Sequence, residues 1–450
     1  MTRDFTQSNT WLARAEKTIP LGSQTFSKSK ISYPKGVAPL FIKRGQGCYV
    51  WDADDNRYTD FVSGLLSVSL GYCDHDVDNA VIEQIKSGVT FSLPHQLEIE
   101  VAEQLVDLIP CAEMVRFGKN GSDATSAAVR LARAFTGREH VAVCGYHGWQ
   151  DWYIGSTTRD LGVPNATKAL THGFQYNDLN SLAQIFIEYP QQISAVIMEP
   201  MNVSFPIGFL EKHSQGDPEK QIQHQEKQNF LQQVKALCHQ HGALFVLDET
   251  ITGFRFSLGG AQQLFDVKPD LATFGKGMAN GYPLSAVVGR KDIMLLMEDI
   301  FFSGTFAGET LSLAATKATL SKIQNEQVLE HIYAMGTRLM RGLETLIEKY
   351  QAGQWLSLAG HPAWSFLVMT DAAPYSVIEL KSLLLQEMLE RGMLVGGGGH
   401  NLNFAHKESH IDALLNVYDE VIGLLSQVIK EQNFADHFRG ELLQAVFKVR

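Results

Sequence analysis

Near the middle of this chain, a short apolar run is twice followed by a charged residue, and this pattern constrains the fold most. Residues 243–247 are typical of a buried strand and lead into Asp248, and residues 271–274 are typical of a second strand, closely followed by Lys276. Runs of this kind alternate with helical periodicity over about residues 73–325. The alternation predicts an α/β fold, with a mainly parallel sheet covered by helices on both faces.

An acid at the end of one strand and a lysine after another would meet the needs of a pyridoxal 5'-phosphate (PLP) site. The lysine amine would form a Schiff base with the aldehyde of the cofactor, and the carboxylate would pair with the pyridinium nitrogen and keep the ring an electron sink. Either residue alone is more often solvated or salt-bridged. Their spacing and context make Asp248 and Lys276 the predicted catalytic residues.

The residues around both positions resemble the class III aminotransferases, a family that includes the glutamate-1-semialdehyde 2,1-aminomutases. The family pattern is Asp-Glu, then Thr-Gly-Phe, then Asp-x-x-x-x-Gly-Lys, and here it stands at residues 248–249, 252–254 and 270–276. The resemblance runs over about residues 20–421. It is nearer to the aminomutase branch, because residues 254–257 read Phe-Arg-Phe-Ser where many ω-amino-acid aminotransferases carry Gly-Arg-Thr-Gly.

The resemblance implies the PLP-dependent transferase fold of type I, in which a large domain with a mainly parallel, seven-stranded type of sheet is joined to a smaller α+β domain. A chain of 450 residues is long enough for about two or three domains. We expect an N-terminal arm and part of the small domain at residues 1–70, the large PLP-binding domain at 71–325 and the C-terminal small domain at 326–450. A long helical pattern over residues 311–347 would link the two domains.

Residues 114–137 predict a strand, a glycine-rich break and a capped helix, with Ser122 or its neighbour as the cap. Free amides and the helix dipole at such an N-terminus can hold a phosphate. The signal is weak by itself, because the loop is neither a Rossmann nor a Walker motif. The resembled family usually has Asn-Ser-Gly-Thr-Glu-Ala here, and residues 119–124 read Lys-Asn-Gly-Ser-Asp-Ala. We therefore assign Gly121 and Ser122 to the PLP phosphate.

The same resemblance implies four further contacts with the cofactor. Tyr146, which precedes a His-Gly pair, would stack on one face of the pyridine ring, and Thr250, where the family usually has Val or Ala, would pack on the other. Glu199 follows the predicted strand 193–198 and would lie near the cofactor. Thr305 belongs to a Gly-Thr-x-x-Gly turn that, in the family, crosses to the phosphate of the partner subunit. This last position implies a homodimer with a shared active site.

The implied function is a ping-pong transfer of an amino group between a primary amine or amino acid, with glutamate as the expected donor, and a carbonyl acceptor. The alternative is an intramolecular transfer of the aminomutase type. Aminomutases carry a glycine- and serine-rich gating segment after the His-Gly pair and a Gly-Asn-Met after the Glu-Pro, and residues 149–173 and 201–206 match neither. A second alternative is an inactive PLP-fold interaction protein, against which the retained Asp248 and Lys276 argue. The substrate, an amino acid, an amino sugar or another carbonyl compound, stays open.

Composition argues against two classes of partner. The net charge of −11 without a basic cluster argues against a nucleic-acid or anionic-membrane surface. No run of roughly eighteen apolar residues predicts a membrane span, and residues 1–7 are polar. The five cysteines are scattered without a C-x-x-C pair, so we expect neither a metal site nor a disulfide framework, and a cytoplasmic location.

Several segments allow two interpretations. The arm at residues 1–38 would either lie on the surface or reach the active site, and the glycine run at 396–399 would border the substrate pocket or form a plain loop. Trp149 and Trp152 would line that pocket or pack in the core, and Arg255 would bind a carboxylate or be structural. The polar residues 211–228 are interpreted as a surface insertion.

Overall fold

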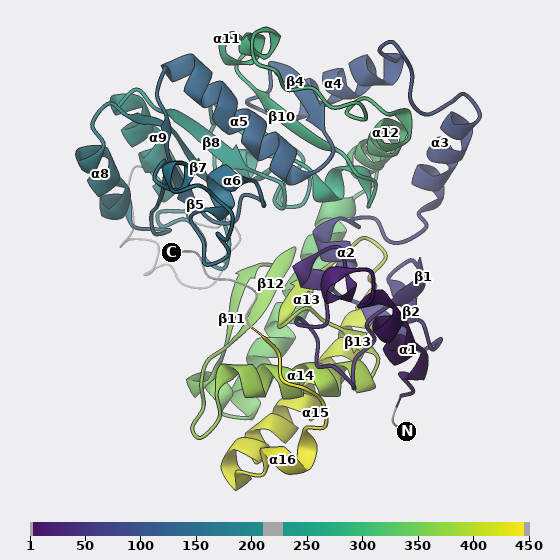
Figure 1. The fold of residues 1–450 in the computed structure, drawn as a ribbon. Helices are drawn as coiled ribbons and strands as arrows, with labels where there is room; N and C mark the ends of the chain where they lie inside the picture. Colours follow the sequence, from purple (N-terminus) through teal and green to yellow (C-terminus); the bar gives the residue numbers. More distant parts are fainter. Residues whose placement is uncertain (1–2, 210–227, 445–450) are drawn as a thin grey trace. The chain divides into compact units, whose positions relative to one another are not determined.

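The computed structural model describes residues 3–209 and 228–444, which divide into two compact units (Figure 1). Unit 1 contains the described residues up to His75 and those from Gln327 onward, and unit 2 spans Asp76–Glu326. Each unit is treated by itself below. The predicted surface insertion at 211–228 lies, except for its last residue, outside the described residues.

Unit 2 is built on a seven-stranded sheet with the strand order β4-β10-β9-β8-β7-β5-β6. The five strands from β9 to β6 run parallel, whereas β10 is antiparallel to both β4 and β9. The predicted α/β class with a mainly parallel sheet is confirmed. The strands are β4 (Met114–Gly118), β5 (His140–Cys144), β6 (Thr171–Gly173), β7 (Ile193–Met198), β8 (Leu244–Asp248), β9 (Leu271–Phe274) and β10 (Ser285–Gly289).

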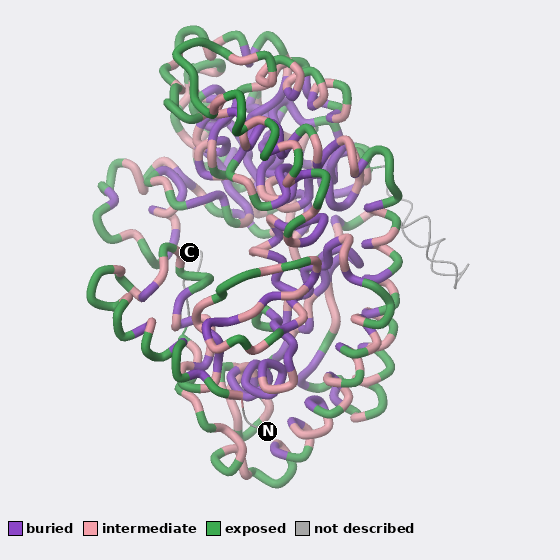
Figure 2. Tube along the Cα trace, turned by 90° about the vertical axis from the view of Figure 1, so that its right-hand side faces the viewer, coloured by how far each residue is buried: buried purple, intermediate pink, exposed green. Residues whose placement is uncertain are grey.

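The central strands of this sheet are buried along their whole length, because helices cover both faces of a parallel sheet. Every residue of β7, β8 and β9 is buried, and Figure 2 shows buried positions gathered inside the unit. The helices are α3 (His75–Ile85), α4 (Gln96–Leu108), α5 (Gly121–Thr136), α6 (Asp151–Ile154), α7 (Asn165–Lys168), α8 (Leu179–Glu188), α9 (Phe230–Gln240), α10 (Ala261–Leu264), α11 (Lys291–Met294) and α12 (Thr310–Asn325).

Helix α5 lies along one face of the sheet (Figure 1). Its alanine-rich face, with Ala128, Leu131 and Ala132, packs against buried residues of β7, β9 and β10. Small side chains let the helix approach the strands closely, and the helix ends at Gly137, whose φ of 69° is the left-handed conformation of a typical helix C-terminus. This packing fixes the N-terminus of α5 at the edge of the sheet where the parallel strands end.

The long helical pattern predicted over residues 311–347 is divided between two helices. The structure has α12 and a separate α13 (Val328–Lys349), and Glu326 between them is extended, with φ −117° and ψ 147°. Ile323 and Val328 are five positions apart, so one continuous helix would turn them about 140° away from each other. Both are buried, and the break allows each to face its own core.

Unit 1 contains two smaller sheets, with strand orders β1-β2-β3-β13 and β11-β12-β14. The glycine run at 396–399 is an ordered turn in this unit, closed by a hydrogen bond from Gly399 N to Gly396 O of 2.9 Å. Its elements are α1 (Thr6–Ala15), β1 (Ile42–Gln46), β2 (Tyr49–Asp52), β3 (Arg57–Asp60), α2 (Ser63–Leu66, a left-handed turn), α13, β11 (Leu356–His361), β12 (Trp364–Met369), α14 (Val377–Glu390), β13 (Met393–Leu394), β14 (Gly399–Asn401), α15 (Glu408–Glu431) and α16 (Phe434–His437).

Within residues 3–209 and 228–444, no helix is both long enough and apolar enough to cross a lipid bilayer.

The contacts of Asp270, just before β9, predict how much this residue contributes to the stability of unit 2. Its buried carboxylate accepts hydrogen bonds from Phe245 N (2.8 Å) and Arg290 Nη1 (2.8 Å) and lies 2.9 Å from His239 Nε2. Asp270→Asn leaves Arg290 without its buried partner and should lower the free energy of unfolding by about 2–3 kcal/mol, measured by urea unfolding. Asp292→Asn, which removes the exposed partner of the same arginine, should change it by less than about 0.5 kcal/mol. Equal effects of the two substitutions would contradict this account.

Candidate active site

Three ionisable side chains meet at the carboxyl edge of the parallel strands in unit 2. Glu199 directly follows β7, Asp248 ends β8, and Lys276 lies two positions after β9. The register pairs Met198 with Leu247 and Asp248 with Thr273, so the three strands end side by side. This edge is where open α/β sheets bind their ligands.

Asp248 is the most enclosed of these groups and has a full set of partners. Its Oδ1 accepts hydrogen bonds from Thr250 N (3.1 Å), Thr250 Oγ1 (2.6 Å) and Thr273 Oγ1 (3.0 Å), and its Oδ2 lies 2.8 Å from His147 Nδ1. Burial alone would raise the pKa of this carboxyl, but His147 and Thr250 outweigh it and hold the pKa below its usual value. The site therefore contains one buried, ionised carboxylate.

His147 is the residue of this site to which the sequence assigned no role. It is buried, and its second ring nitrogen, Nε2, lies 3.2 Å from the carbonyl oxygen of Cys144. Two acceptors on opposite sides thus fix the orientation of the ring, which in turn orients Asp248. The signal was its place in the His-Gly pair after Tyr146, but only the fold brings residue 147 next to residue 248.

Glu199 and Lys276 are shifted in opposite directions. Burial is the largest cause that raises the pKa of Glu199, and the charge of Asp248 adds to it. Burial also lowers the pKa of Lys276, with Arg255 contributing in the same direction, while Glu199 and Asp248 partly counter it. The neutral forms of both groups are favoured relative to those in water, so a proton can pass to or from the lysine at low cost.

The N-terminus of α5 lies beside this cluster. Asn120, not Ser122 or its direct neighbour, caps the helix, and its side chain and that of Asp123 satisfy each other's main-chain amides. A Cβ atom on Gly121 would lie 3.0 Å from Thr250 Cγ2, which shows how closely this terminus approaches the residues after Asp248. Ser122 Oγ accepts a hydrogen bond from Trp149 N (3.3 Å).

Gly148 explains how the loop after β5 can pass so close to this terminus. A Cβ atom at this position would lie 2.3 Å from Ser122 Oγ, and its φ of 106° is a conformation that L side chains rarely adopt. A glycine is therefore required. The loop in front of it carries Tyr146, which is half exposed, contacts Tyr153 edge-on with ring centroids 5.6 Å apart, and has its main-chain amide 3.4 Å from Glu199 Oε2.

The structure thus brings together most of the predicted site residues, but not Thr305. The gathered residues are Gly121, Ser122, Tyr146, Glu199, Asp248, Thr250 and Lys276. Thr305 lies in an exposed turn that lines a separate cavity of about 540 Å³, together with Phe91, His95 and Arg116. Its predicted role toward a partner subunit stays a prediction.

The two tryptophans and Arg255 take different positions. Trp152 is buried in the core of unit 2, where its Nε1 donates to Ser126 Oγ (2.9 Å), so it packs rather than lines a pocket. Trp149 is 63% exposed. Arg255 is buried, and burial lowers the pKa of its guanidinium to about 10.

Comparison with known proteins identifies the family. The family model for aminotransferase class-III matches residues 32–402. This chain belongs to the class III aminotransferase family. The family predicted from the motifs around Asp248 and Lys276 is confirmed.

Relatives with different activities have similar sequence identity to this member of the class III aminotransferase family. The 3-aminobutyryl-CoA aminotransferase of Cloacimonas acidaminovorans is 34% identical over 350 residues, which cover 77% of this chain and 80% of the relative. The glutamate-1-semialdehyde 2,1-aminomutase of Desulforudis audaxviator is 34% identical over 451 residues, with 93% and 98% covered. Among solved structures, the PLP internal aldimine form of the FumI protein of Sphingopyxis sp. MTA144 has a TM-score of 0.83 and 27% identity, with 96% and 98% covered.

The effect of Glu199 on the pKa of Lys276 can be tested, because its direction is known. The carboxylate of Glu199 favours the charged amine, so Glu199→Gln should lower the pKa of Lys276 further, since burial and Arg255 then act with less opposition. The pH dependence of reductive methylation at Lys276, followed by peptide mass spectrometry on the cofactor-free protein, should move to lower pH. Glu188→Gln, an exposed control on α8, should leave it unchanged. A shift to higher pH would contradict the assigned interaction.

Proposed function

We propose that this chain is a PLP-dependent aminotransferase that moves an amino group from a primary amine or amino acid to a carbonyl acceptor. The observation that carries the proposal is that an ionised Asp248 and a lysine of lowered pKa, Lys276, lie at the ends of neighbouring strands. Membership of the class III family and the PLP form of the FumI protein support it.

The residues present fit the cofactor. Gly121 and Ser122 begin α5, whose terminal amides suit a phosphate. Asp248 would pair with the ring nitrogen, Lys276 would hold the aldehyde carbon, and Tyr146 and Thr250 would lie on the two faces of the ring. When bound, PLP supplies the electron sink that stabilises negative charge on the substrate carbon next to nitrogen.

The side chains of this chain then perform the proton steps. Asp248 would keep a proton on the ring nitrogen by a charge-assisted hydrogen bond, and His147 holds the carboxylate in place. The amine of Lys276 would take the proton from the substrate carbon bonded to nitrogen and deliver it to C4′, the cofactor carbon on the other side of that nitrogen, because its lowered pKa leaves more of the amine neutral. Glu199, with its raised pKa, is suited to exchange a proton with Lys276.

Transfer between two molecules is supported over transfer within one by the segment after the His-Gly pair. Residues 149–173 include α6, α7 and β6. Trp152 ties them to the core, since its Nε1 donates to Ser126 Oγ of α5 and its carbonyl oxygen accepts from Thr171 Oγ1. Asp160 and Lys168 form an ion pair of 2.8 Å within the segment. A gate that closes over a bound intermediate needs a segment free to move. Glutamate is the proposed donor.

The visible spectrum of the purified protein with PLP tests the proposal. Wild type should show the band of the lysine-bound cofactor, and glutamate alone should replace it with the band of the aminated cofactor and release about one equivalent of 2-oxoglutarate per site. Lys276→Ala, the control, should lose the band and at least about a thousandfold in turnover while keeping its circular dichroism. If glutamate changes nothing but glutamate 1-semialdehyde is isomerised without a carbonyl acceptor, the protein is an aminomutase. Absence of any cofactor band would refute the proposal.

Thr305 tests the proposed shared-site homodimer. If its hydroxyl reaches the phosphate of the partner's cofactor, Thr305→Ala should weaken PLP binding by roughly tenfold, the worth of one charge-assisted hydrogen bond. Ser303→Ala, in the same turn, serves as the control. The dissociation constant from absorbance titration of the cofactor-free protein, with the mass from light scattering, provides the measurement. An unchanged constant or a monomeric protein would contradict the shared site.

A further inference from the structure

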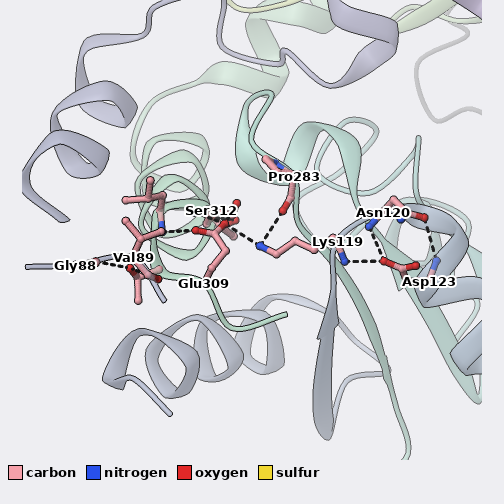
Figure 3. Close-up of polar contacts among 11 residues, drawn as sticks. Gly88, Val89, Lys119, Asn120, Asp123, Pro283, Glu309 and Ser312 are labelled. Carbon is pink, nitrogen blue, oxygen red and sulfur yellow. Dashed lines mark hydrogen bonds and ion pairs between the residues drawn. The ribbon is translucent and has the colours of Figure 1, made fainter. Parts of the chain in front are cut away.

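Lys119 occupies a position where the resembled family usually has asparagine, and its two ends are held by different helices. It directly follows β4 and precedes Asn120, the cap of α5. Its main-chain amide donates to Asp123 Oδ2 (2.9 Å), within the capping arrangement of α5. Its side chain extends away from this loop, and Nζ donates to Glu309 Oε1 (2.8 Å) and to the carbonyl oxygen of Pro283 (3.1 Å) (Figure 3).

Glu309 is itself a helix cap, at the start of α12. Its carboxylate accepts hydrogen bonds from the amides of Leu311 (2.9 Å) and Ser312 (3.1 Å), and from the hydroxyl of Ser312. The side chains of Lys119 and Glu309 are only 21% and 12% exposed. Burial opposes the charge of Glu309, but the hydrogen bonds from Lys119 and Ser312 outweigh it, and the pKa lies below its usual value. The pair is therefore an ion pair with little access to water.

Pro283 adds a third segment, the connection that runs from Lys276 to β10. The same three segments also meet one residue earlier. A Cβ atom on Gly118 would lie 2.9 Å from Ser285 Oγ, 2.9 Å from Asp123 Cβ and 3.4 Å from the ring of Phe302. The end of β4, the start of β10 and the segment that leads into the turn with Thr305 thus converge at this point.

We propose that Lys119 is a positioning residue that fixes the three segments which carry the cofactor-binding side chains. Its ammonium joins the loop of Gly121 and Ser122, the connection that begins at Lys276 and the segment that runs from Thr305 to Glu309. The inference rests on the proposed function, because that function assigns the first two segments to the cofactor of one subunit and the segment with Thr305 to the cofactor of its partner. Lys119 acts through other residues and not on the reacting atoms.

The expected consequence is a loss of cofactor affinity rather than of chemistry. Without the ammonium, Glu309 is left as a buried charge without its partner, and the three segments lose their common contact. PLP binding must then order them, which weakens the binding without altering Lys276 or Asp248. The catalytic rate at saturating PLP should therefore change much less than the dissociation constant.

A double-mutant cycle with a matched control tests this inference on the cofactor-free protein titrated with PLP. Lys119→Met and Glu309→Gln should each raise the dissociation constant by roughly tenfold, and the double variant should be no weaker than either one, as expected for directly interacting residues. Lys119→Arg should leave the dissociation constant within about threefold of the wild-type value, because arginine keeps the positive charge and can donate both hydrogen bonds. Lys317→Met is the matched control. Lys317 lies on α12, the helix that Glu309 caps, and forms an exposed ion pair with Glu100 on α4. Its substitution should change the dissociation constant by less than about twofold.

Thermal unfolding of the cofactor-free variants separates positioning from mere stabilisation. If Lys119→Met lowers the melting temperature but leaves the PLP dissociation constant unchanged, Lys119 is only a structural link and the inference is overturned. Multiplying, independent effects of Lys119→Met and Glu309→Gln would also overturn it. If Lys119→Met does not fold, Glu309→Gln and Lys119→Arg carry the test. Failure of wild type to bind PLP would refute the proposed function instead, and is seen before any variant is measured.

Discussion

The site depends on one buried carboxylate that remains charged. Asp248 has been removed from water at the end of β8, a change that would favour its neutral form, and four polar contacts reverse that preference. A buried charge of this kind must be compensated locally, so the positions of His147, Thr250 and Thr273 are set by it. These residues come from three different segments, and the carboxylate is the group that brings their polar atoms to one place.

Two other buried acids show why the position of Asp248 is special. Glu249, its neighbour, accepts hydrogen bonds from Thr252, Ala261 and Gln262, and therefore holds the loop after β8. Asp270 accepts from Phe245 and Arg290 before β9 begins, at the opposite end of that strand from Lys276. All three acids belong to the family motif, yet the contacts of Glu249 and Asp270 serve the framework, whereas Asp248 lies in the cluster with Lys276.

The sequence predicts those parts of the fold that depend on local pattern. The strands 193–198 and 271–274 agree with the structure residue for residue, because fully buried parallel strands are continuous apolar runs. The pairing of an acid and a lysine at strand ends follows from the same runs, since parallel strands end at one edge of the sheet. The break between α12 and α13 was not predicted, because the sequence has helical periodicity on both sides of it. The buried face of the helix changes between Ile323 and Val328.

Contacts between residues that are far apart in the chain could not be predicted from the sequence. His147 and Asp248 are 101 positions apart, and Lys119 and Glu309 are 190 apart. No spacing rule relates such residues, and each has an ordinary alternative as a solvated side chain. The cap of α5 was misassigned for a related reason, because Asn120 and Ser122 are both good caps and only the geometry of the preceding strand decides between them.

The charge of Asp248 also raises the pKa values of both of its ionisable neighbours in the cluster. Because it remains negative, it makes ionisation of Glu199 harder and stabilises the charged form of Lys276, while burial disfavours charge on both. The two neighbours are thus brought closer in pKa than the same groups in water, one from below and one from above. In water, the pKa values of a lysine and a glutamate differ by about six. Proton transfer at Lys276 is in this sense a property of the whole cluster, and the partners that keep Asp248 ionised take part in it without touching the lysine.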